Sequence, residues 1–375
     1  MAQSSRTASP APRTGRAALK AAVDRLVRES GIRATSPGIA VLVDRSDGVL
    51  LMAGYGLADV KRRVPITPCT RFELASVSKI FTATAVLLLQ DRAFLSIDDD
   101  VRDYLPELPR YRSGPLRIRD MLRHASGLPH YFDLEDVPRS HPTHYVDADY
   151  LEEFARQRHK VSLRFPIGQK FEYNNSNFML LAVVVERAAK KPYRQFLHDA
   201  IFAPLGMRNT FVYSSPDSVP IDSKPPCSNA IGYRREGRTW VASWGTTPDR
   251  QEEHLEVGDG GIWSNLQDMA RWDAAVRARK LLKPATWKLA LTPSQTGDGK
   301  TNPYGLGWWL YANRSGRLYG FGHDGYWQGF ATSYYDYLAE QHSVVLLSNR
   351  GESIDLNKFW DKLNRLIRAH APPKG

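Results

Sequence analysis

Ser76 and Lys79 are the residues of this chain whose types and spacing could carry out chemistry. They stand three positions apart at the start of an apolar run, residues 80–89, which predicts a buried helix. The spacing puts both side chains on one helical face, next to unpaired backbone N–H groups that favour negative charge. A hydroxyl with an amine in reach and N–H donors beside it has the parts that acyl transfer needs. A serine before a helix is more often only an N-cap, so the assignment depends on further motifs.

Two more motifs follow in chain order, Tyr173-x-Asn175 and His323-x-Gly325. The first comes after a Phe-Pro-Ile-Gly turn and opens an apolar segment, and the second comes before a strand-like stretch. β-Lactamases and penicillin-binding proteins carry Ser-x-x-Lys, Ser-Asp-Asn and Lys-Thr-Gly in this order. In this chain, tyrosine and histidine stand in place of that serine and that lysine.

Together the motifs resemble those of the serine β-lactamase-related family, in the branch of class C β-lactamases, D-alanyl-D-alanine carboxypeptidases and related esterases. Tyr-x-Asn is the usual second motif of that branch. Residues 122–128, 260–264 and 268–272 agree with it, and the resemblance covers roughly residues 37–349. It implies an α/β (α+β) fold of the β-lactamase/transpeptidase type. In that fold an antiparallel sheet built from both chain ends is flanked by helices, with an inserted helical subdomain.

The resemblance also implies roles for the catalytic residues. Ser76 would be the nucleophile that forms an acyl-enzyme, and a serine hydroxyl needs a base. A neutral Lys79 could be that base, or a charged Lys79 could stabilise a Tyr173 phenolate that takes the proton. Because the two titrations are coupled, the sequence leaves both routes open. Asn175 is expected to orient the substrate carbonyl or amide and to bond Lys79.

The His-x-Gly motif is expected to line the substrate site. His323 could donate a hydrogen bond to Tyr173 or to a substrate carboxylate. Gly325 would let its strand approach the substrate closely, and the backbone N–H of Tyr326 would join that of the nucleophile in the oxyanion hole. Asp324 departs from the family pattern, in which threonine is common. It puts recognition of a carboxylate-bearing peptide or β-lactam in doubt.

Other histidines stay outside the predicted site. His124 lies in a stretch that the resemblance marks as structural support. A further group shows no spacing typical of a metal site, and we expect it to form a loop over the pocket: His130, His141, His144, Asp133 and Asp136. We therefore expect neither a metal nor another cofactor. The absence of a Gly-x-Ser-x-Gly motif argues against an α/β-hydrolase.

The two cysteines, Cys69 and Cys227, lie far apart and do not form a disulfide framework or a metal-ligand spacing. We expect Cys69 to be a small buried residue. A bridge between the two stays open at this point.

The composition is that of an ordinary globular protein, with 42% hydrophobic and 11% aromatic residues among 375. Its net charge of +11 comes from scattered lysines and arginines, so nucleic-acid binding is not expected. No run approaches the roughly 18 to 20 apolar residues of a membrane span. Residues 1–16 lack the apolar core of a signal peptide. These absences favour the cytoplasm, while the oligomeric state stays open.

The pattern of the chain predicts its organisation. We expect a disordered tail at 1–16 and one hydrolase domain at 17–371, with sheet segments at about 17–75 and 300–371 and a mainly helical part at about 90–300. The segment 214–228, rich in proline and serine, should be a surface loop or lid. Helices are expected at 17–28 and 354–370, and strands at 38–43, 49–55, 331–337 and 343–347.

These features favour a metal-free serine hydrolase that acts on a small ester or amide through an acyl-enzyme on Ser76. A D-Ala-D-Ala carboxypeptidase or a class C-like β-lactamase is the first alternative. Peptidoglycan chemistry takes place outside the cytoplasm and no export signal is visible, so we rank it second. The other alternative is a binding or scaffold protein that has kept the fold without catalysis.

Overall fold

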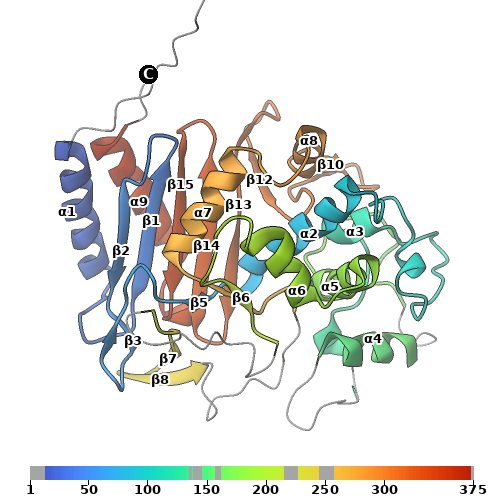
Figure 1. Ribbon diagram of the computed structural model, residues 1–375, viewed down its shortest axis with the longest axis horizontal. Coiled ribbons are helices and arrows are strands. Elements are labelled where there is room, and N and C mark those ends of the chain that lie inside the picture. The colour runs from blue at the N-terminus through green and yellow to red at the C-terminus, as the bar shows by residue number, and fades with distance from the viewer. Residues whose placement is uncertain are drawn as a thin grey trace, which may run out of the picture.

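The fold is built around a six-stranded antiparallel sheet (Figure 1), in a computed structural model that describes residues 13–134, 137, 146–156, 162–214, 227–244 and 257–372. Its strands, in spatial order, are β12 (Trp309–Ala312), β13 (Leu318–Trp327), β14 (Phe330–Tyr337), β15 (His342–Ser348), β1 (Ile39–Arg45) and β2 (Leu51–Tyr55). The pairing of β1 with β15 joins the two ends of the chain in one sheet. This confirms the predicted antiparallel sheet.

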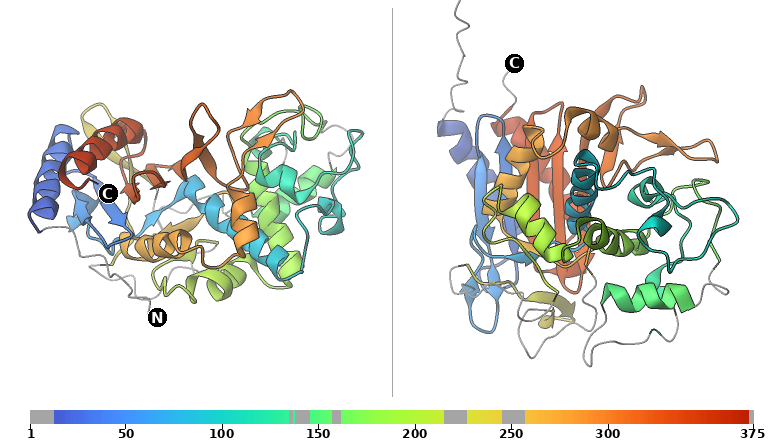
Figure 2. Two further views of the ribbon diagram at one scale, coloured as in Figure 1. Left: turned by 90° about the horizontal axis from the view of Figure 1, so that it is seen from above. Right: turned by 45° about the vertical axis from the view of Figure 1, so that its right-hand side comes forward.

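Helices cover both faces of the sheet and give three layers (Figure 2). On one face lie α1 (Arg13–Glu29) and α9 (Leu356–His370), and on the other lie α2 (Lys79–Asp91) and α7 (Leu266–Arg277). The helices predicted at 17–28 and 354–370 are thus confirmed, and α1 begins a turn earlier than expected.

Strand β1 shows why both faces are covered. Ile39, Val41 and Val43 belong to the core under α1 and α9, whereas Ala40 and Leu42 belong to the core around α2. Because successive side chains point to opposite faces, a strand with helices on both sides is apolar throughout.

The predicted hairpin between the first two strands is also confirmed. β1 and β2 pair from Ile39↔Tyr55 to Val43↔Leu51. Gly48 in the connection has a φ of +117°, which glycine adopts without strain.

The helical part lies beside the sheet and is centred on α2 and α5 (Asn175–Ala189), which pack together. Every residue of α2 from Lys79 to Leu89 is buried, as the apolar run predicts. The other helical elements are η2 (Val101–Asp103), α3 (Ile118–Leu122), η3 (Tyr131–Asp133), α4 (Asp147–Arg156), α6 (Tyr193–Leu197), η4 (His198–Phe202), α8 (Pro284–Ala290) and η7 (Gly351–Ser353).

Short strands outside the main sheet connect these parts. One three-stranded sheet, of order β5-β9-β6, runs directly into the turn that carries Ser76. The short strands are β3 (Leu57–Asp59), β4 (Val64–Pro65), β5 (Phe72–Glu73), β6 (Phe211–Val212), β7 (Gly232–Glu236), β8 (Thr239–Trp244), β9 (Ile262–Ser264), β10 (Ser294–Gln295) and β11 (Thr301–Asn302).

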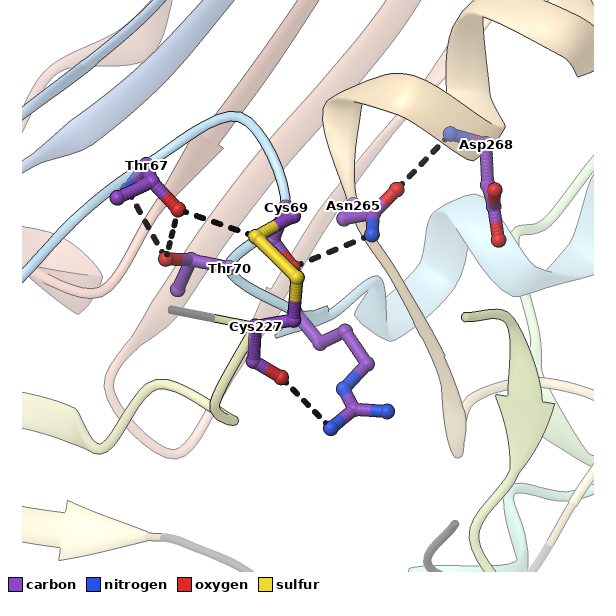
Figure 3. The surroundings of a disulfide bond; sticks show 7 residues. Thr67, Cys69, Thr70, Cys227, Asn265 and Asp268 are labelled. Carbon is purple, nitrogen blue, oxygen red and sulfur yellow. Dashed lines mark hydrogen bonds between the residues drawn. A yellow bond between two sulfur atoms is a disulfide. The ribbon is translucent and has the colours of Figure 1, made fainter. Parts of the chain in front are cut away.

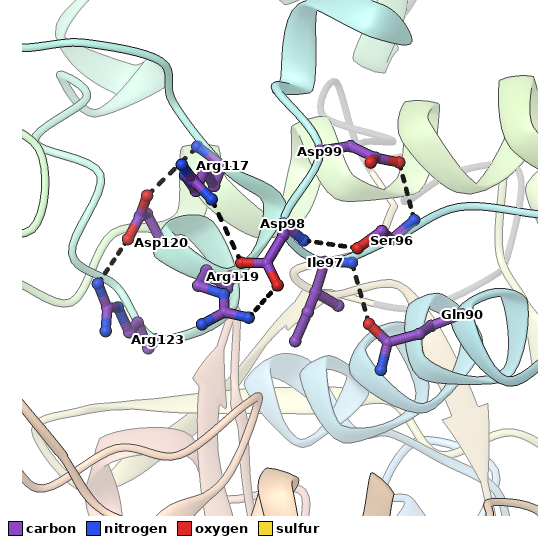
Figure 4. A network of polar contacts seen from close by, with 9 residues as sticks. All are labelled: Gln90, Ser96, Ile97, Asp98, Asp99, Arg117, Arg119, Asp120 and Arg123. Carbon is purple, nitrogen blue, oxygen red and sulfur yellow. Dashed lines mark hydrogen bonds and ion pairs between the residues drawn. The ribbon is translucent and has the colours of Figure 1, made fainter. Parts of the chain in front are cut away.

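Charged side chains fix the segment between α2 and α3 (Figure 4). Asp98 accepts from Arg117 and Arg119, and Arg123 donates to Asp120 at 2.6 Å. These pairs hold both ends of the short helix α3. The helix in turn places His124 beneath the active-site region described below.

A disulfide joins Cys69 to Cys227, 158 residues further along (Figure 3). Asn265, the N-cap of α7, donates to the Cys69 carbonyl at 3.2 Å, and Arg71 donates to the Cys227 carbonyl at 2.7 Å. The structure therefore decides the pairing that the sequence leaves open. The bridge anchors the segment that leads into β5 and Ser76.

Several predicted features lie outside the described residues. They are residues 1–12 of the expected tail, residues 215–226 of the expected lid, Asp136, His141 and His144. In the described ranges, no helix is long and apolar enough to cross a membrane. The same ranges contain no cluster of three or more histidine, cysteine or acidic residues arranged to bind a metal ion.

The disulfide generates a prediction about stability. Replacing both cysteines by serine should lower the free energy of unfolding by about 2 to 4 kcal/mol, because the bridge closes a long loop in the unfolded chain. Denaturant unfolding with and without a reductant measures this effect. The reductant should lower the free energy of unfolding of wild type and leave that of the double variant unchanged. If wild type with reduced thiols is as stable as the oxidised protein, the prediction is wrong.

Candidate active site

Ser76 lies on a tight turn, η1 (Ala75–Ser78), directly before α2. The turn is held from two sides, since Leu74 N–H donates to Ile262 O at 2.8 Å and Thr332 Oγ1 donates to Leu74 O at 2.6 Å. Ala75 has a φ of +49°, a left-handed conformation that is unfavourable for alanine. Packing around the turn therefore enforces the position of Ser76, which a regular first helical turn would not give.

Lys79 begins α2, and its side chain meets Ser76 as the spacing predicts. Its Nζ donates to Ser76 Oγ at 3.0 Å and to the main-chain O of Asp259 at 2.8 Å. The residue is fully buried. Burial lowers the pKa of Lys79 to about 8, although the nearby carboxylates of Asp259 and Asp324 oppose this shift. A neutral amine next to the serine hydroxyl is therefore accessible near neutral pH.

Tyr173 closes the other side of this pair and forms a hydrogen bond with Ser76. Its ring lies 4.4 Å from the His124 ring and stacks on Trp309 at 6.0 Å, measured between centroids. Burial raises the pKa of Tyr173 well above its usual range. Burial thus makes proton loss easier for Lys79 and harder for Tyr173.

Asn175 is the first residue of α5, after the N-cap Asn174, whose side chain accepts from Ser176 N at 2.8 Å. The expected bond between Asn175 and Lys79 is not formed, and the amine donates to Ser76 Oγ and the Asp259 carbonyl instead. The Oδ1 atom of Asn175 is buried and has no hydrogen-bond partner among the described residues. A buried acceptor of this kind is costly unless another group satisfies it, and a substrate N–H could do so.

His323 lies on β13, and its two ring nitrogens are both engaged. Nδ1 is 2.6 Å from the main-chain O of Asp324, and Nε2 is 2.8 Å from the Tyr304 hydroxyl. A carbonyl only accepts, so Nδ1 carries the proton and Nε2 accepts from Tyr304. Burial, with the charge of Lys79 nearby, lowers the pKa of His323 to about 3, so the ring is neutral. The expected hydrogen bond from His323 to Tyr173 is therefore not present.

Tyr304 is a site residue that the sequence reasoning missed. It is fully buried, and its ring contacts those of His124 at 4.6 Å, Trp309 at 5.0 Å and His323 at 5.6 Å. Its hydroxyl donates to Nε2 of His323, whose tautomer is set by the Asp324 carbonyl at Nδ1. Its position in a Tyr-Gly-Leu-Gly-Trp stretch has no fixed spacing to the three motifs, so only the folded chain reveals it.

Gly325 is where β13 meets the serine turn. A Cβ atom there would lie 2.5 Å from Leu74 O and 2.8 Å from Ser76 N, so a larger residue would push the strand away. The pairing of β13 with β12 ends at Gly322, so residues 323–327 face the turn along a strand edge without a β12 partner. The role of the next N–H, that of Tyr326, in an oxyanion hole stays a prediction.

Asp324 points to the other face of β13, as alternation along a strand requires. Its Oδ1 is 3.4 Å from the Tyr335 hydroxyl, and burial raises the pKa of the carboxyl group. It is nevertheless close enough to act electrostatically on Lys79. A carboxylate thus stands beside the site, where a threonine is common in the family.

His124 supports the site from below, as expected. Its Nδ1 accepts from the backbone N–H of Asn174 at 3.1 Å, and its ring packs against Tyr173 and Phe178. The strands and helices therefore bring together Ser76, Lys79, Tyr173 and Gly325. His323 lies beside this group, with its ring 6.1 Å from the Tyr173 ring.

Comparison with known proteins agrees with this geometry. A penicillin-binding protein of Bacillus subtilis (strain 168) is 30% identical over 328 residues, which are 84% of this chain and 68% of that protein. Protein flp of Staphylococcus aureus (strain MW2) is 25% identical, over 93% of this chain and 66% of its own length. The crystal structure of a penicillin-binding protein from Bacillus halodurans superposes with a TM-score of 0.74 at 25% identity, covering 92% of this chain and 98% of that one. The model of the Beta-lactamase family matches residues 23–369. This chain belongs to the Beta-lactamase family.

Proposed function

We propose that the protein is a serine hydrolase that cleaves a small ester or amide through an acyl-enzyme on Ser76. The observation that carries this proposal is the 3.0 Å contact between a fully buried amine and the serine hydroxyl. The alternative of a fold kept only for binding does not account for it. A buried amine is costly, and its pairing with a hydroxyl on a strained turn is typical of a nucleophile and its base.

In this proposal Lys79, in its neutral form, is the general base. It takes the proton from Ser76 Oγ as that oxygen attacks the substrate carbonyl carbon. The backbone N–H groups of Ser76 and Tyr326 would bind the resulting oxyanion. When the tetrahedral intermediate breaks down, the Lys79 ammonium returns the proton to the leaving alcohol or amine. Water then attacks the acyl-enzyme, with the same proton transfers, and releases the carboxylic acid and free Ser76.

We infer a preference for substrates without a carboxylate next to the scissile bond. Asp324 occupies the position of the family's threonine, and although its side chain lies on the other face of β13, its charge acts on Lys79 and would also repel a substrate carboxylate bound there. In the described residues, the cation beside Ser76 is Lys79, whose amine donates hydrogen bonds to Ser76 and to the main-chain O of Asp259. Esters and amides without such a carboxylate are therefore favoured over D-Ala-D-Ala peptides and β-lactams, which carry one. The small-molecule partner, and the expectation that no nucleic acid binds, remain predictions.

The disulfide bears on the compartment. Disulfides form and persist in oxidising environments and are rare in the cytosol. We therefore propose that the mature protein works under oxidising conditions, in place of the cytoplasm that the sequence favours. Counting free thiols in protein isolated without reductant tests this proposal.

Removing either proposed catalytic group should abolish turnover. Ser76→Ala and Lys79→Met should each lower kcat by about 1000-fold or more, with unfolding free energies within about 1 kcal/mol of wild type. Methionine keeps most of the lysine's buried volume, so it separates chemistry from packing. A fluorophosphonate probe should label wild type but not Ser76→Ala. Equal labelling of both proteins would mean that another residue is the nucleophile.

The pKa of Lys79, lowered to about 8, predicts the pH dependence. Only the neutral amine can accept a proton, so kcat/KM for an uncharged ester should climb from pH 6 to pH 8 and level off above. His323 is neutral over this whole range because its pKa is lowered to about 3. A profile that instead falls from pH 6 to 8, and flattens in His323→Lys, would show that an imidazolium charge matters.

Nitrocefin should be a poor substrate compared with a short-chain p-nitrophenyl ester. The reason is the carboxylate of Asp324 in place of a hydroxyl, and Asp324→Thr should raise nitrocefin turnover relative to the ester. Steady-state kcat/KM on both substrates measures this. A wild-type value on nitrocefin of roughly 10⁴ M⁻¹s⁻¹ or above, as enzymes reach on their own substrates, would overturn the preference.

A further inference from the structure

Three aromatic rings stack beside the serine turn and form what we call the aromatic wall: His130, Phe132 and Trp327. The rings of His130 and Phe132 are 5.1 Å apart and 11° from parallel, and those of Phe132 and Trp327 are 5.9 Å apart and 13° from parallel. Phe132 is 44% exposed, so part of its ring is accessible at the surface. The wall joins η3 of the helical part to the end of β13.

The wall lies next to Ser76. Trp327 follows Gly325 by two residues on the same face of β13, which places it about 6 to 7 Å further along the strand edge. Gly325 itself is in van der Waals contact with the serine turn. From the other side, Tyr131 donates to Asp259 Oδ2 at 3.1 Å, and the main-chain O of Asp259 accepts from Lys79. The segment that carries Phe132 is thus tied to the residue that holds the proposed base.

The direction along β13 assigns the wall to one side of the substrate. Lys79, which returns the proton in the proposed mechanism, lies on the His323 side of Gly325, since its Nζ is 5.2 Å from the centroid of the Tyr173 ring and that ring is 6.1 Å from the His323 ring. The leaving group must lie on that side, because it receives the proton there. A carbonyl held at Gly325 and Tyr326 then directs its acyl group the opposite way, toward Trp327.

The wall offers this acyl group an apolar surface without charge. Burial lowers the pKa of His130, so its ring is neutral at neutral pH. The neighbouring carboxylate of Asp133 pairs with Arg164 at 3.6 Å. Burying an apolar acyl group against such a surface is favourable in free energy, whereas a charged acyl group finds no partner there.

Building on the serine hydrolase proposed above, we infer that the aromatic wall is the acyl-binding site and selects esters or amides of uncharged, apolar carboxylic acids larger than acetic acid. Phe132 and Trp327 are the specificity-determining residues. Because Phe132 stacks with both of its neighbours in the wall, the acyl chain packs against the ring edges along the wall.

The test varies the acyl group at a constant leaving group. p-Nitrophenyl acetate, butyrate, hexanoate and monosuccinate are compared on the full chain, on Phe132→Ala and on Trp327→Phe. In wild type, kcat/KM should rise about 10- to 100-fold from acetate to hexanoate, and monosuccinate should fall below butyrate. Phe132→Ala should lose most of this rise while its kcat/KM on acetate changes less than about twofold. Phe94→Ala, which removes a 59% exposed phenylalanine after the far end of α2, is the matched control and should behave as wild type.

Three results would overturn the inference. One is a flat acyl-length profile in wild type, and another is an equal loss on acetate and hexanoate in Phe132→Ala. The third concerns butyrate esters of different alcohols. If the loss of kcat/KM in Phe132→Ala depends on the alcohol, the wall lies on the leaving-group side. Labelling of Ser76 by fluorophosphonate separates these results from failure of the proposed function. Labelled protein with a flat profile rejects only the wall, whereas unlabelled and inactive protein rejects both.

Discussion

The burial of the Lys79 amine is the constraint on which the rest of the site depends. An ammonium removed from water is costly, and this cost lowers the pKa of Lys79 into the range where the amine can act as a base. Tyr173, His124 and His323 are buried in the same region, and burial raises the pKa of Tyr173 and lowers the pKa values of the two histidines. One physical cause therefore keeps the neighbouring groups neutral. It leaves Lys79 as the group whose proton is most easily lost.

Burial of this amine requires three distant parts of the chain. The sheet brings β13, which belongs to the C-terminal part, against the turn before α2, and the absence of a side chain at Gly325 permits that contact. The helical part supplies Tyr173 above His124. The segment at Asp259 supplies the carbonyl that accepts from Lys79. The disulfide and the α3 ion pairs do not touch the substrate site, but they fix the segments that enter it.

The departures from the family motifs act on the side of the site that would face the leaving group. Histidine in place of lysine removes a fixed charge, and its engagement with Tyr304 also removes the expected donor toward Tyr173. Asp324 adds a carboxylate at the next position. In the proposed function, both changes would weaken attraction for a substrate carboxylate. The aromatic wall adds an apolar surface at the opposite side, so the two ends of the proposed site differ in the chemistry they accept.

The sequence by itself determined what depends on local spacing. The three-residue interval of Ser76 and Lys79, the hairpin turn at Gly48 and the apolar patterns of α2, β14, β15 and α9 are all readable in the chain, because near neighbours set helical faces and strand alternation. The sequence did not show that the His-x-Gly motif lies inside the strand β13, since the glycines that permit its close packing also weaken the strand pattern. Tertiary structure alone decided the Cys69–Cys227 bridge, the partnership of His323 with Tyr304 and the stack of Phe132 on Trp327. It also left the Asn175 oxygen without a partner among the described residues. Each of these depends on atoms brought together by long-range packing, and pKa shifts follow burial, which no interval in the sequence encodes.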